Sequence, residues 1–358
     1  MRVPLPFLTL AVLMLTPRTS AGQPAVIKVH EIPEKGLTFK GKLNEKSPPL
    51  AALKGAPHTS YRVKLQKRQS YVIDLVSKDF DSFLILAEAA GKIVAYDNDG
   101  GKGQHSQLVI FASSGGIHRL LAASLNKQLG TFQLSVRAAM LSDKQLAAAA
   151  EKLNVDGVRL YQQGIAPAAV GKLRTAYQIC RKLYPAKKYP TGHPDLATSL
   201  HNLAAVLHAL KQLPQARSYY ERAVSMRRKI YSESKYPQGH PELATSLNNL
   251  GSVLQAMGRF RDAVPFYQQC LAMLRRLYTT TKYPAGHPNL AQSLDNVGLV
   301  LQPVGRWQEA LTYHRQSLAM RRRLYPGSKY PNGHPGIAGN LNNIGFVMWS
   351  LGHAEGVP

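Results

Sequence analysis

One stretch of sequence occurs four times in this chain, and it constrains the fold more than any other feature. The copies are KYPTGHPDLATSLHNLA, KYPQGHPELATSLNNLG, KYPAGHPNLAQSLDNVG and KYPNGHPGIAGNLNNIG. Their histidines, His193, His240, His287 and His334, follow one another at a constant spacing of 47 residues. A fixed period of this length is typical of a solenoid, in which each unit buries its apolar face against its neighbours. We therefore expect a solenoid in the second half of the chain, and binding rather than catalysis as its role.

Each repeat is predicted to contain two helices. His and Pro open the first helix, because Pro at the first helical position loses no hydrogen bond. Glycines at the end of the first helix are predicted to adopt a positive φ; they are Gly258, Gly305 and Gly352. The first helices share apolar columns at Ala197, Ala244, Ala291 and Ala338, at Leu200, Leu247, Leu294 and Leu341, and at Leu203, Leu250, Val297 and Ile344. The second helices share Ala216, Ala263 and Ala310, and Tyr220, Tyr267 and His314.

The segment NNLGSVLQAMGRFRDAVPFYQQCLAM resembles the tetratricopeptide repeat, and the flanking HPELATSLNNLG and RRLY make it similar to the kinesin light chain variety. The resemblance covers residues 142–358, with a degenerate first unit and an incomplete last one. The period is longer than in that family because of the KYP insertion. The resemblance implies an all-α right-handed superhelix whose concave groove binds peptides or protein segments.

Residues 36–138 have a different pattern, made of short alternating segments with turn residues between them. Segments such as SYVIDLVS, SFLILAE and TFQLSVRA have the length and composition of strands. They predict an all-β sandwich of the jelly-roll type. The stretches DFDSFLIL and AGKIVAYDNDGG resemble the bacterial pre-peptidase C-terminal domain, a small accessory sandwich of exported proteins. Residues 23–35 are predicted to be a linker.

Four acidic residues of this region stand out in a basic chain: Asp79, Asp81, Asp97 and Asp99. Carboxylates suit a hard cation, so a calcium site is one interpretation. The other is turn chemistry, because Asp, Asn and Gly are the residues that tight turns require. The spacing fits no complete calcium loop and favours turns, so we predict no metal and no cofactor.

Residues 1–22 read as an export signal. Arg2 precedes an apolar run that ends at Leu15, and small residues near Ala21 and Gly22 provide a cleavage site. Only 15 residues separate Arg2 from Arg18, fewer than the roughly 18 to 20 that a spanning helix needs. The mature protein is therefore expected to be secreted or periplasmic, with no membrane span.

The formal charge of +25 at pH 7 favours anionic partners or surfaces. Residues 142–358 hold 27 Lys and Arg against 11 Asp and Glu. Nucleic acid is not expected, because the aromatic residues follow the repeat register and no nucleic-acid module is recognised. The two cysteines, Cys180 and Cys270, lie two units apart in the repeat register, too far for a disulfide.

Two columns of side chains are candidate binding sites. The first consists of polar residues on the first helices: Asn202, Asn249, Asn296 and Asn343, preceded by His201, Asn248, Asp295 and Asn342. A carboxamide both donates and accepts hydrogen bonds, so this column could pair with the main chain of an extended ligand, or it could bridge adjacent repeats. The second column is basic and could hold an acidic partner or simply favour the helix ends: Arg181, Arg228, Arg275 and Arg322.

The four motif histidines are predicted to be helix-entry residues rather than metal ligands, because side chains one repeat apart are too distant to share a zinc ion. The tyrosines of the motif are predicted to anchor the loops by packing on the neighbouring unit. They are Tyr189, Tyr236, Tyr283 and Tyr330.

No catalytic motif is visible: the sequence contains no HExxH, no GxSxG and no phosphate loop. We therefore expect a non-enzymatic, exported scaffold that binds a protein or peptide, and the basic charge favours an acidic one; the oligomeric state stays open. One alternative is the regulatory front part of a longer caspase-like protease, since the fourth unit has only its first helix. The other alternative is adhesion to a polyanion or surface.

Overall fold

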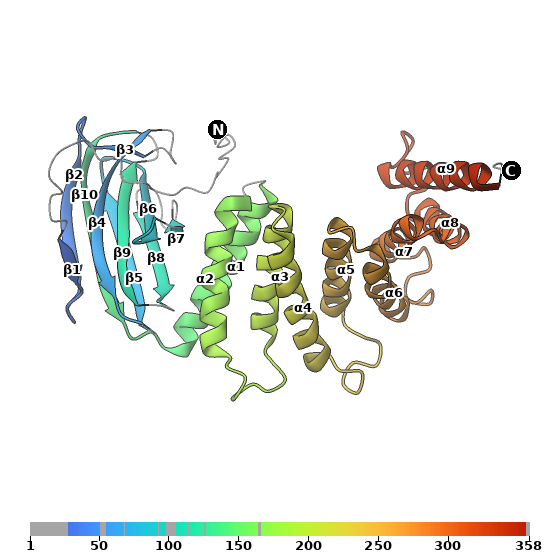
Figure 1. Ribbon diagram of the computed structural model, residues 1–358, viewed down its shortest axis with the longest axis horizontal. Coiled ribbons are helices and arrows are strands. Elements are labelled where there is room, and N and C mark those ends of the chain that lie inside the picture. Colours follow the sequence, from blue (N-terminus) through green and yellow to red (C-terminus); the bar gives the residue numbers. More distant parts are fainter. Residues whose placement is uncertain are drawn as a thin grey trace. The chain divides into compact units, whose positions relative to one another are not determined.

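The computed structural model describes residues 28–50, 55–67, 69–91, 93–97, 105–112, 115–124, 127–163 and 166–355. The chain divides into two compact units, Met1–Pro185 and Ala186–Pro358. Figure 1 labels the strands and helices that make up both units. Residues 1–22, predicted to be an export signal, lie outside the described residues. Among the helices that are described, none combines the length and the apolar character needed to cross a membrane.

The first unit contains two packed sheets, as the alternating segments predict. One sheet has the strand order β1-β4-β9-β6-β7, with β3 paired to β4, and the other has the order β2-β10-β5-β8. The strands are β1 (Val29–Glu31), β2 (Leu37–Leu43), β3 (Pro49–Leu50), β4 (Ala56–Leu65), β5 (Ser70–Ser77), β6 (Ser82–Glu88), β7 (Ile93–Asp97), β8 (His105–Phe111), β9 (Gly116–Ser124) and β10 (Gly130–Ala139). The fold is a β-sandwich whose inner side chains form one apolar core, with Ile73, Leu84 and Leu134 completely buried.

The sandwich begins earlier in the chain than the sequence predicts. Residues 23–35, predicted to be a linker, contain β1, which pairs in parallel with β4. The Nζ atom of Lys64 lies 2.9 Å from Glu31 Oε1 across this pair. Short edge strands carry too few alternating residues to be recognised from sequence.

A helical hairpin follows the sandwich within the first unit. Its helices are α1 (Asp143–Gln162) and α2 (Ala166–Leu183), and α1 begins with a capping box between Ser142 and Gln145. Helix α2 packs against β7 and β8. The degenerate first repeat, predicted to belong to the helical region, is thus part of the same compact unit as the sandwich.

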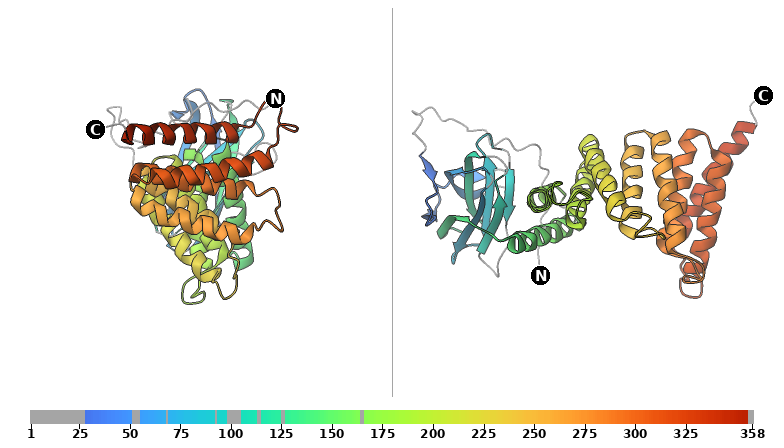
Figure 2. Two further views of the ribbon diagram at one scale, coloured as in Figure 1. Left: turned by 90° about the vertical axis from the view of Figure 1, so that its right-hand side faces the viewer. Right: turned by 90° about the horizontal axis from the view of Figure 1, so that it is seen from below.

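The second unit is a row of helical hairpins (Figure 2). Its helices are α3 (Pro194–Ala209), α4 (Leu213–Ile230), α5 (Pro241–Ala256), α6 (Phe260–Leu277), α7 (Pro288–Leu301), α8 (Trp307–Leu324) and α9 (Pro335–Glu355), with a short 3₁₀ turn, η2 (Gln302–Val304), after α7. The second helix of each hairpin packs on the first helix of the next: α4 on α5, α6 on α7 and α8 on α9. This packing is the stacking that the 47-residue period predicts.

The repeated KYP-x-GH loops are built around the motif histidines. In the second copy, His240 caps α5, because its Nδ1 accepts a hydrogen bond from the Glu242 amide at 3.2 Å. Its ring stacks on Tyr231 at 3.7 Å and meets the edge of Tyr236 at 5.4 Å. His287 and His334 make the same contacts in their own copies. The histidines are therefore helix-entry residues and the tyrosines are loop anchors, as predicted.

The glycines of the first three loops allow each loop to pack closely against the second helix of the hairpin that follows it. Gly239 has φ +84°, and a Cβ there would come within 2.4 Å of Met273 Cγ on α6. Gly192 and Gly286 face Met226 and Met320 in the same way. The loop thus needs both a left-handed backbone and an absent side chain, which only glycine provides.

The ends of the first helices differ in part from expectation. Gly258 and Gly305 adopt positive φ values of 73° and 81° where the helix turns back. Lys211 occupies the same register in the preceding hairpin, and it has φ +60°. The expectation for Gly352 was wrong: this residue lies inside α9, which continues to Glu355 instead of turning into a second helix.

Candidate functional site

The predicted polar column forms a ladder that joins consecutive first helices. Asn249 Nδ2 lies 3.3 Å from His201 Nε2. Asn296 donates from Nδ2 to Asn248 Oδ1 at 2.8 Å, and Asn343 donates to Asp295 Oδ1 at 3.2 Å. Each of these three hydrogen bonds is a rung of the ladder. Each first helix carries two adjacent polar residues, and a rung joins the first of them to the second polar residue of the next first helix. The column therefore bridges adjacent repeats through hydrogen bonds between side chains.

The residues of the ladder differ in their exposure to solvent. Most members are half-buried, but Asp295 is buried and Asn342 is exposed; Asn202, at the start of the column, is half-buried on α3. The carboxamide of Asn249 also accepts a hydrogen bond from Asn248 Nδ2 at 3.2 Å. A carboxamide has two N–H donors and two acceptor lone pairs. The half-buried members thus retain hydrogen-bonding capacity beyond the rungs.

His201 is the most strongly perturbed member of the column. Burial and the nearby Arg227 guanidinium lower its pKa from 6.5 to about 3. Its Nε2 faces the donating Asn249 amide, so the ring is neutral with its proton on Nδ1, 3.2 Å from Ser246 Oγ. The ring also meets Tyr220 edge to face at 5.4 Å. His201 is therefore a neutral hydrogen-bonding group, not a cation.

Asp295 is the centre of a buried cluster at the last repeat junction. Its Oδ1 accepts hydrogen bonds from His314 Nδ1 at 2.6 Å and from Asn340 Nδ2 at 2.8 Å. The other ring nitrogen of His314 lies 3.0 Å from Gln302 Nε2. His314 has no exposed surface. This His–Asp pair therefore holds helices together and cannot reach a substrate.

The predicted basic column lies on the second helices. Its four arginines, Arg181, Arg228, Arg275 and Arg322, are all exposed. Arg228 donates from Nη2 to Gln269 Oε1 at 2.7 Å, and Arg275 donates to Gln316 Oε1 at 3.2 Å. These bonds join successive second helices just as the amide ladder joins successive first helices. Their acceptors are neutral, so they leave the guanidinium charges uncompensated.

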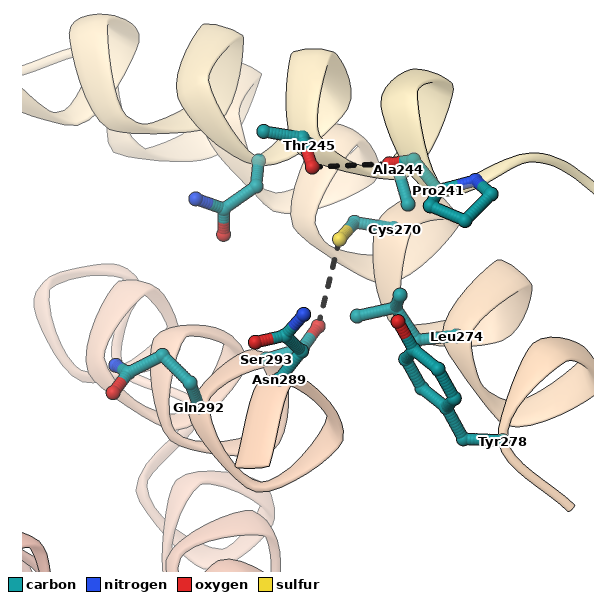
Figure 3. Close-up of a pocket in the computed structure, with 10 residues that line it drawn as sticks. Pro241, Ala244, Thr245, Cys270, Leu274, Tyr278, Asn289, Gln292 and Ser293 are labelled. Atoms are coloured by element: carbon teal, nitrogen blue, oxygen red, sulfur yellow. Dashed lines mark hydrogen bonds between the residues drawn. The ribbon is translucent and has the colours of Figure 1, made fainter. Parts of the chain in front are cut away.

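The structure also contains a hollow that the sequence analysis missed. It lies between α5 and α7 with its floor on α6, and its volume is about 200 Å³ (Figure 3). Its lining includes Asn248 of the polar column together with Leu274, Tyr278 and Ser293. One feature of the sequence could have indicated the hollow. In the column one position before the exposed arginines, Leu274 occupies the register that Arg227 holds in the repeat before and Arg321 in the repeat after. A leucine among arginines marks a position that faces the interior.

Asp79 and Asp97 of the sandwich make hydrogen bonds and an ion pair within the protein. Asp79 Oδ2 accepts hydrogen bonds from the Thr131 amide at 2.6 Å and from the Thr131 hydroxyl at 2.7 Å, and these bonds lower the pKa of Asp79. Asp97 accepts from Lys172 Nζ at 2.9 Å and from the Gln107 amide at 2.9 Å. Asp99 lies outside the described residues. Over the described part of the chain, no group of three or more His, Cys, Asp or Glu side chains could hold a metal ion.

Both cysteines are buried and form no disulfide. Burial raises the pKa of the Cys270 thiol to about 11. Cys270 is therefore a neutral thiol in the floor of the hollow, where Ser293 Oγ lies 3.7 Å from its sulfur. This environment does not produce a reactive thiolate.

The tetratricopeptide repeat family model matches residues 196–242, 243–289 and 290–335. These residues are tetratricopeptide repeats. The three matches follow one another without a gap and cover the polar ladder from Asn202 to Asp295 and Asn296. Tetratricopeptide repeats form extended binding surfaces and are typically non-enzymatic protein-interaction scaffolds.

Similar solved structures fall into two groups. The nearly identical TPR-like repeats of a Podosopora anserina protein described as a kinesin light chain are 21% identical, with a TM-score of 0.47, covering 57% of this chain and 88% of that one. BtubC (BKLC) from P. vanneervenii is 19% identical, with a TM-score of 0.38, covering 59% of this chain and 85% of that one. The pre-peptidase C-terminal domain of collagenase from Bacillus anthracis is 17% identical, with a TM-score of 0.26, covering 32% of this chain and 99% of that one. No match to a curated protein was found.

Proposed function

We propose that this chain is an exported, non-enzymatic scaffold that binds an extended segment of a protein or peptide along the first helices of its tetratricopeptide repeats. The observation that carries the proposal is the ladder of half-buried polar side chains at a constant register. The rungs join α3 to α5, α5 to α7 and α7 to α9, and each rung contains at least one carboxamide: Asn249, Asn296 with Asn248, and Asn343.

The chemistry of the ladder suits a peptide main chain. An extended peptide offers alternating N–H donors and C=O acceptors, and carboxamides pair with both irrespective of the peptide sequence. Asn249 illustrates this capacity, since the rung uses one N–H and Asn248 uses one acceptor lone pair. Because the side chain is held on both sides by neighbours, little side-chain entropy is lost when a ligand binds.

The exposed arginine column supports a second candidate, binding to an acidic segment or an anionic surface. Arg228 and Arg275 each donate to a neutral glutamine on the next second helix, so the guanidinium groups are oriented while their charge stays available. Binding of this kind would weaken steeply with salt, because exposed charges are screened at about 8 Å at physiological ionic strength. The two candidates use different helices and can be separated.

The test is a selection of peptides from a random phage library with the immobilised full chain. Asn249→Ala with Asn296→Ala is expected to abolish enrichment, whereas Arg228→Gln with Arg275→Gln is expected to leave it intact. The arginine pair is a matched control, because its members also make hydrogen bonds between repeats. The opposite pattern, together with loss of the selected peptides at high salt, would establish the anionic partner instead.

Export is tested separately. The chain with residues 1–22 present is produced in a bacterial host, and the soluble periplasmic protein is analysed by N-terminal sequencing. We expect a new terminus near Gly22. Intact protein that begins at Met1 and stays inside the cell would contradict export.

A further inference from the structure

Equivalent positions on the second helices carry a long buried arginine at two repeat junctions and a shorter leucine at the junction between them. One position before the exposed arginine column, the second helices carry Arg227, Leu274 and Arg321 at the 47-residue period. Arg227 and Arg321 are both buried, at 3% and 8% exposure. Each of them reaches between two consecutive first helices.

The Arg227 guanidinium shows what such a junction provides. It donates from Nη1 to the Glu242 carbonyl oxygen at 3.0 Å and to Ser246 Oγ at 2.5 Å, and from Nη2 to Thr198 Oγ1 at 3.2 Å. Three acceptors from α3 and α5 thus surround one planar donor group. Arg321 repeats the arrangement on α7 and α9, donating to the Gly336 carbonyl oxygen at 2.5 Å and to Gln292 Oε1 at 3.0 Å.

The middle junction is the one between α5 and α7, where Leu274 replaces the arginine. The equivalent hydrogen-bond acceptors are present there. Thr245 and Ser293 take the places of Thr198 and Ser246, and Asn289 takes the place of Glu242. All three line the hollow of about 200 Å³ beside Leu274. Figure 3 shows their side chains facing one space from α5 and α7. Thr245 Oγ1 donates to the Pro241 carbonyl oxygen at 3.0 Å, and Ser293 Oγ donates to Cys270 Sγ at 3.7 Å, so both hydroxyls can still accept.

The hollow also lacks the negative charge that accompanies each arginine. Glu242 Oε2 lies 3.2 Å from Arg227, and Asp295 Oδ2 lies 3.7 Å from Arg321. The corresponding residues at the middle junction are Asn289 and Asn248, which are neutral. The residues that line the hollow include no carboxylate, so a cation there would lack the counter-charge that each buried arginine has. The hollow therefore suits a planar hydrogen-bonding group that carries no charge.

We propose that this hollow is a side-chain pocket for the carboxamide of a glutamine or asparagine in the bound peptide. The NH₂ group of the ligand donates to Thr245 Oγ1, Ser293 Oγ or the Asn289 carbonyl oxygen, as the guanidinium does at the flanking junctions. Its carbonyl oxygen accepts from the side-chain amides of Asn248 or Gln292, which also line the hollow. The inference rests on the proposed function, because it places the pocket beside the ladder that holds the peptide main chain.

The experiment uses the full chain with its Asn and Gln side-chain amides labelled with ¹⁵N for NMR. The probes are N-acetylated, amidated peptides of sequence Gly-Ala-X-Ala-Gly, in which X is Gln, Glu, Arg or Leu. We expect the peptide with X as Gln to shift the Asn289 and Gln292 amide signals saturably, with a dissociation constant about threefold to tenfold lower than that of the other three peptides.

Two variants place a larger side chain in the hollow. Leu274→Phe adds a larger apolar side chain, and Leu274→Arg adds the side chain found at the flanking junctions. Both are expected to remove the preference for Gln. A preference that survives Leu274→Phe, or tighter binding of the Glu, Arg or Leu peptide, would overturn the pocket assignment.

The ladder signals separate this inference from the proposed function. If the Asn249 and Asn296 amides shift equally with all four peptides while Gln292 stays still, the main-chain ladder binds peptides and the pocket assignment is wrong. If no peptide shifts the Asn249 or Asn296 signals, the proposed function is wrong, and the pocket assignment that rests on it is wrong as well.

Discussion

Lys172 Nζ on α2 lies 2.9 Å from Asp97 Oδ1 at the end of β7, and both side chains are 5% exposed. Asp156 Oδ2 on α1 is 3.9 Å from the same nitrogen. This buried ion pair ties the first helical hairpin to the sandwich within the first unit. It also occupies the carboxylate that a calcium site would require.

Removing the lysine should detach the hairpin from the sandwich. Lys172→Met leaves Asp97 buried without its cation, which costs about 3 to 5 kcal/mol. We expect faster hydrogen–deuterium exchange in α1, α2 and β7 of the full chain, measured by mass spectrometry. The double variant Lys172→Met with Asp97→Asn should regain much of the protection, because no buried charge is left. Equal exchange in Lys172→Met and the wild type would show that the pair does not hold the hairpin.

His201 should make the stability of the repeats depend on pH. Its pKa is about 3 in the folded protein, against 6.5 for an unperturbed histidine. Between these values the unfolded chain binds a proton that the folded chain excludes, so the free energy of unfolding falls with decreasing pH, by up to about 1.4 kcal/mol per pH unit. Above pH 6.5 the effect is absent. Arg227, Ser246, Asn249 and Tyr220 face the ring and keep it neutral.

The variant His201→Asn tests this dependence, because asparagine is the residue at the same register in the next repeat, Asn248. Urea denaturation between pH 4 and pH 8 should give a shallower loss of stability for the variant than for the wild type. Parallel curves would exclude His201 as the source. His240 and His287, whose pKa values are lowered by burial, contribute equally to both proteins.

Lys211 offers a stabilising substitution. It adopts φ +60°, where Gly258 and Gly305 occupy the same register. A side chain costs about 1 to 2 kcal/mol in this conformation, and the greater freedom of glycine in the unfolded chain offsets part of it. Lys211→Gly should therefore raise the free energy of unfolding by about 0.5 to 1 kcal/mol. Lys211→Ala is the control: it keeps a Cβ and should give no gain, so equal stabilisation by both would point to the lysine charge instead.

An arginine at position 274, between α5 and α7, should be tolerated only when a carboxylate is introduced beside it. Leu274→Arg alone places a guanidinium beside Asn248 and Asn289, and it should destabilise the repeats by about 1 to 3 kcal/mol. Adding Asn289→Glu recreates the Arg227–Glu242 pair and should recover most of that loss. A double-mutant cycle from thermal unfolding measures the coupling, expected to be about 1 kcal/mol or more. A coupling near zero would mean that the three junctions are not equivalent.

The sequence predicted the features that recur locally within one repeat. His240 as a helix cap, Tyr236 as a loop anchor and the positive φ of Gly258 all follow from neighbouring residues, and the structure has them. The two-sheet sandwich followed by helical repeats was predicted for the same reason: periods of two and of 47 residues are visible without any long-range information.

The individual partners in contacts between distant residues were not predicted, although bridging of adjacent repeats was one interpretation of the polar column. Nothing near Lys172 in the sequence indicates Asp97, and the rung between Asn296 and Asn248 spans 48 residues. The choice between Arg227 and Arg228 also needed the structure, because both belong to one basic run at a helix end. Burial separates them: Arg227 lies inside a junction and Arg228 is exposed. In the sequence, the leucine at position 274 and the cysteine at position 180, which has the same register, indicate that this column faces inward.

The most direct test of the account is the crystal structure of the full chain with a peptide from the phage selection. We expect the peptide to lie along α5 and α7, with main-chain N–H and C=O groups within about 3 Å of the Asn249 and Asn296 carboxamides. A peptide bound to the second helices against Arg228 and Arg275, or to the sandwich, would contradict it.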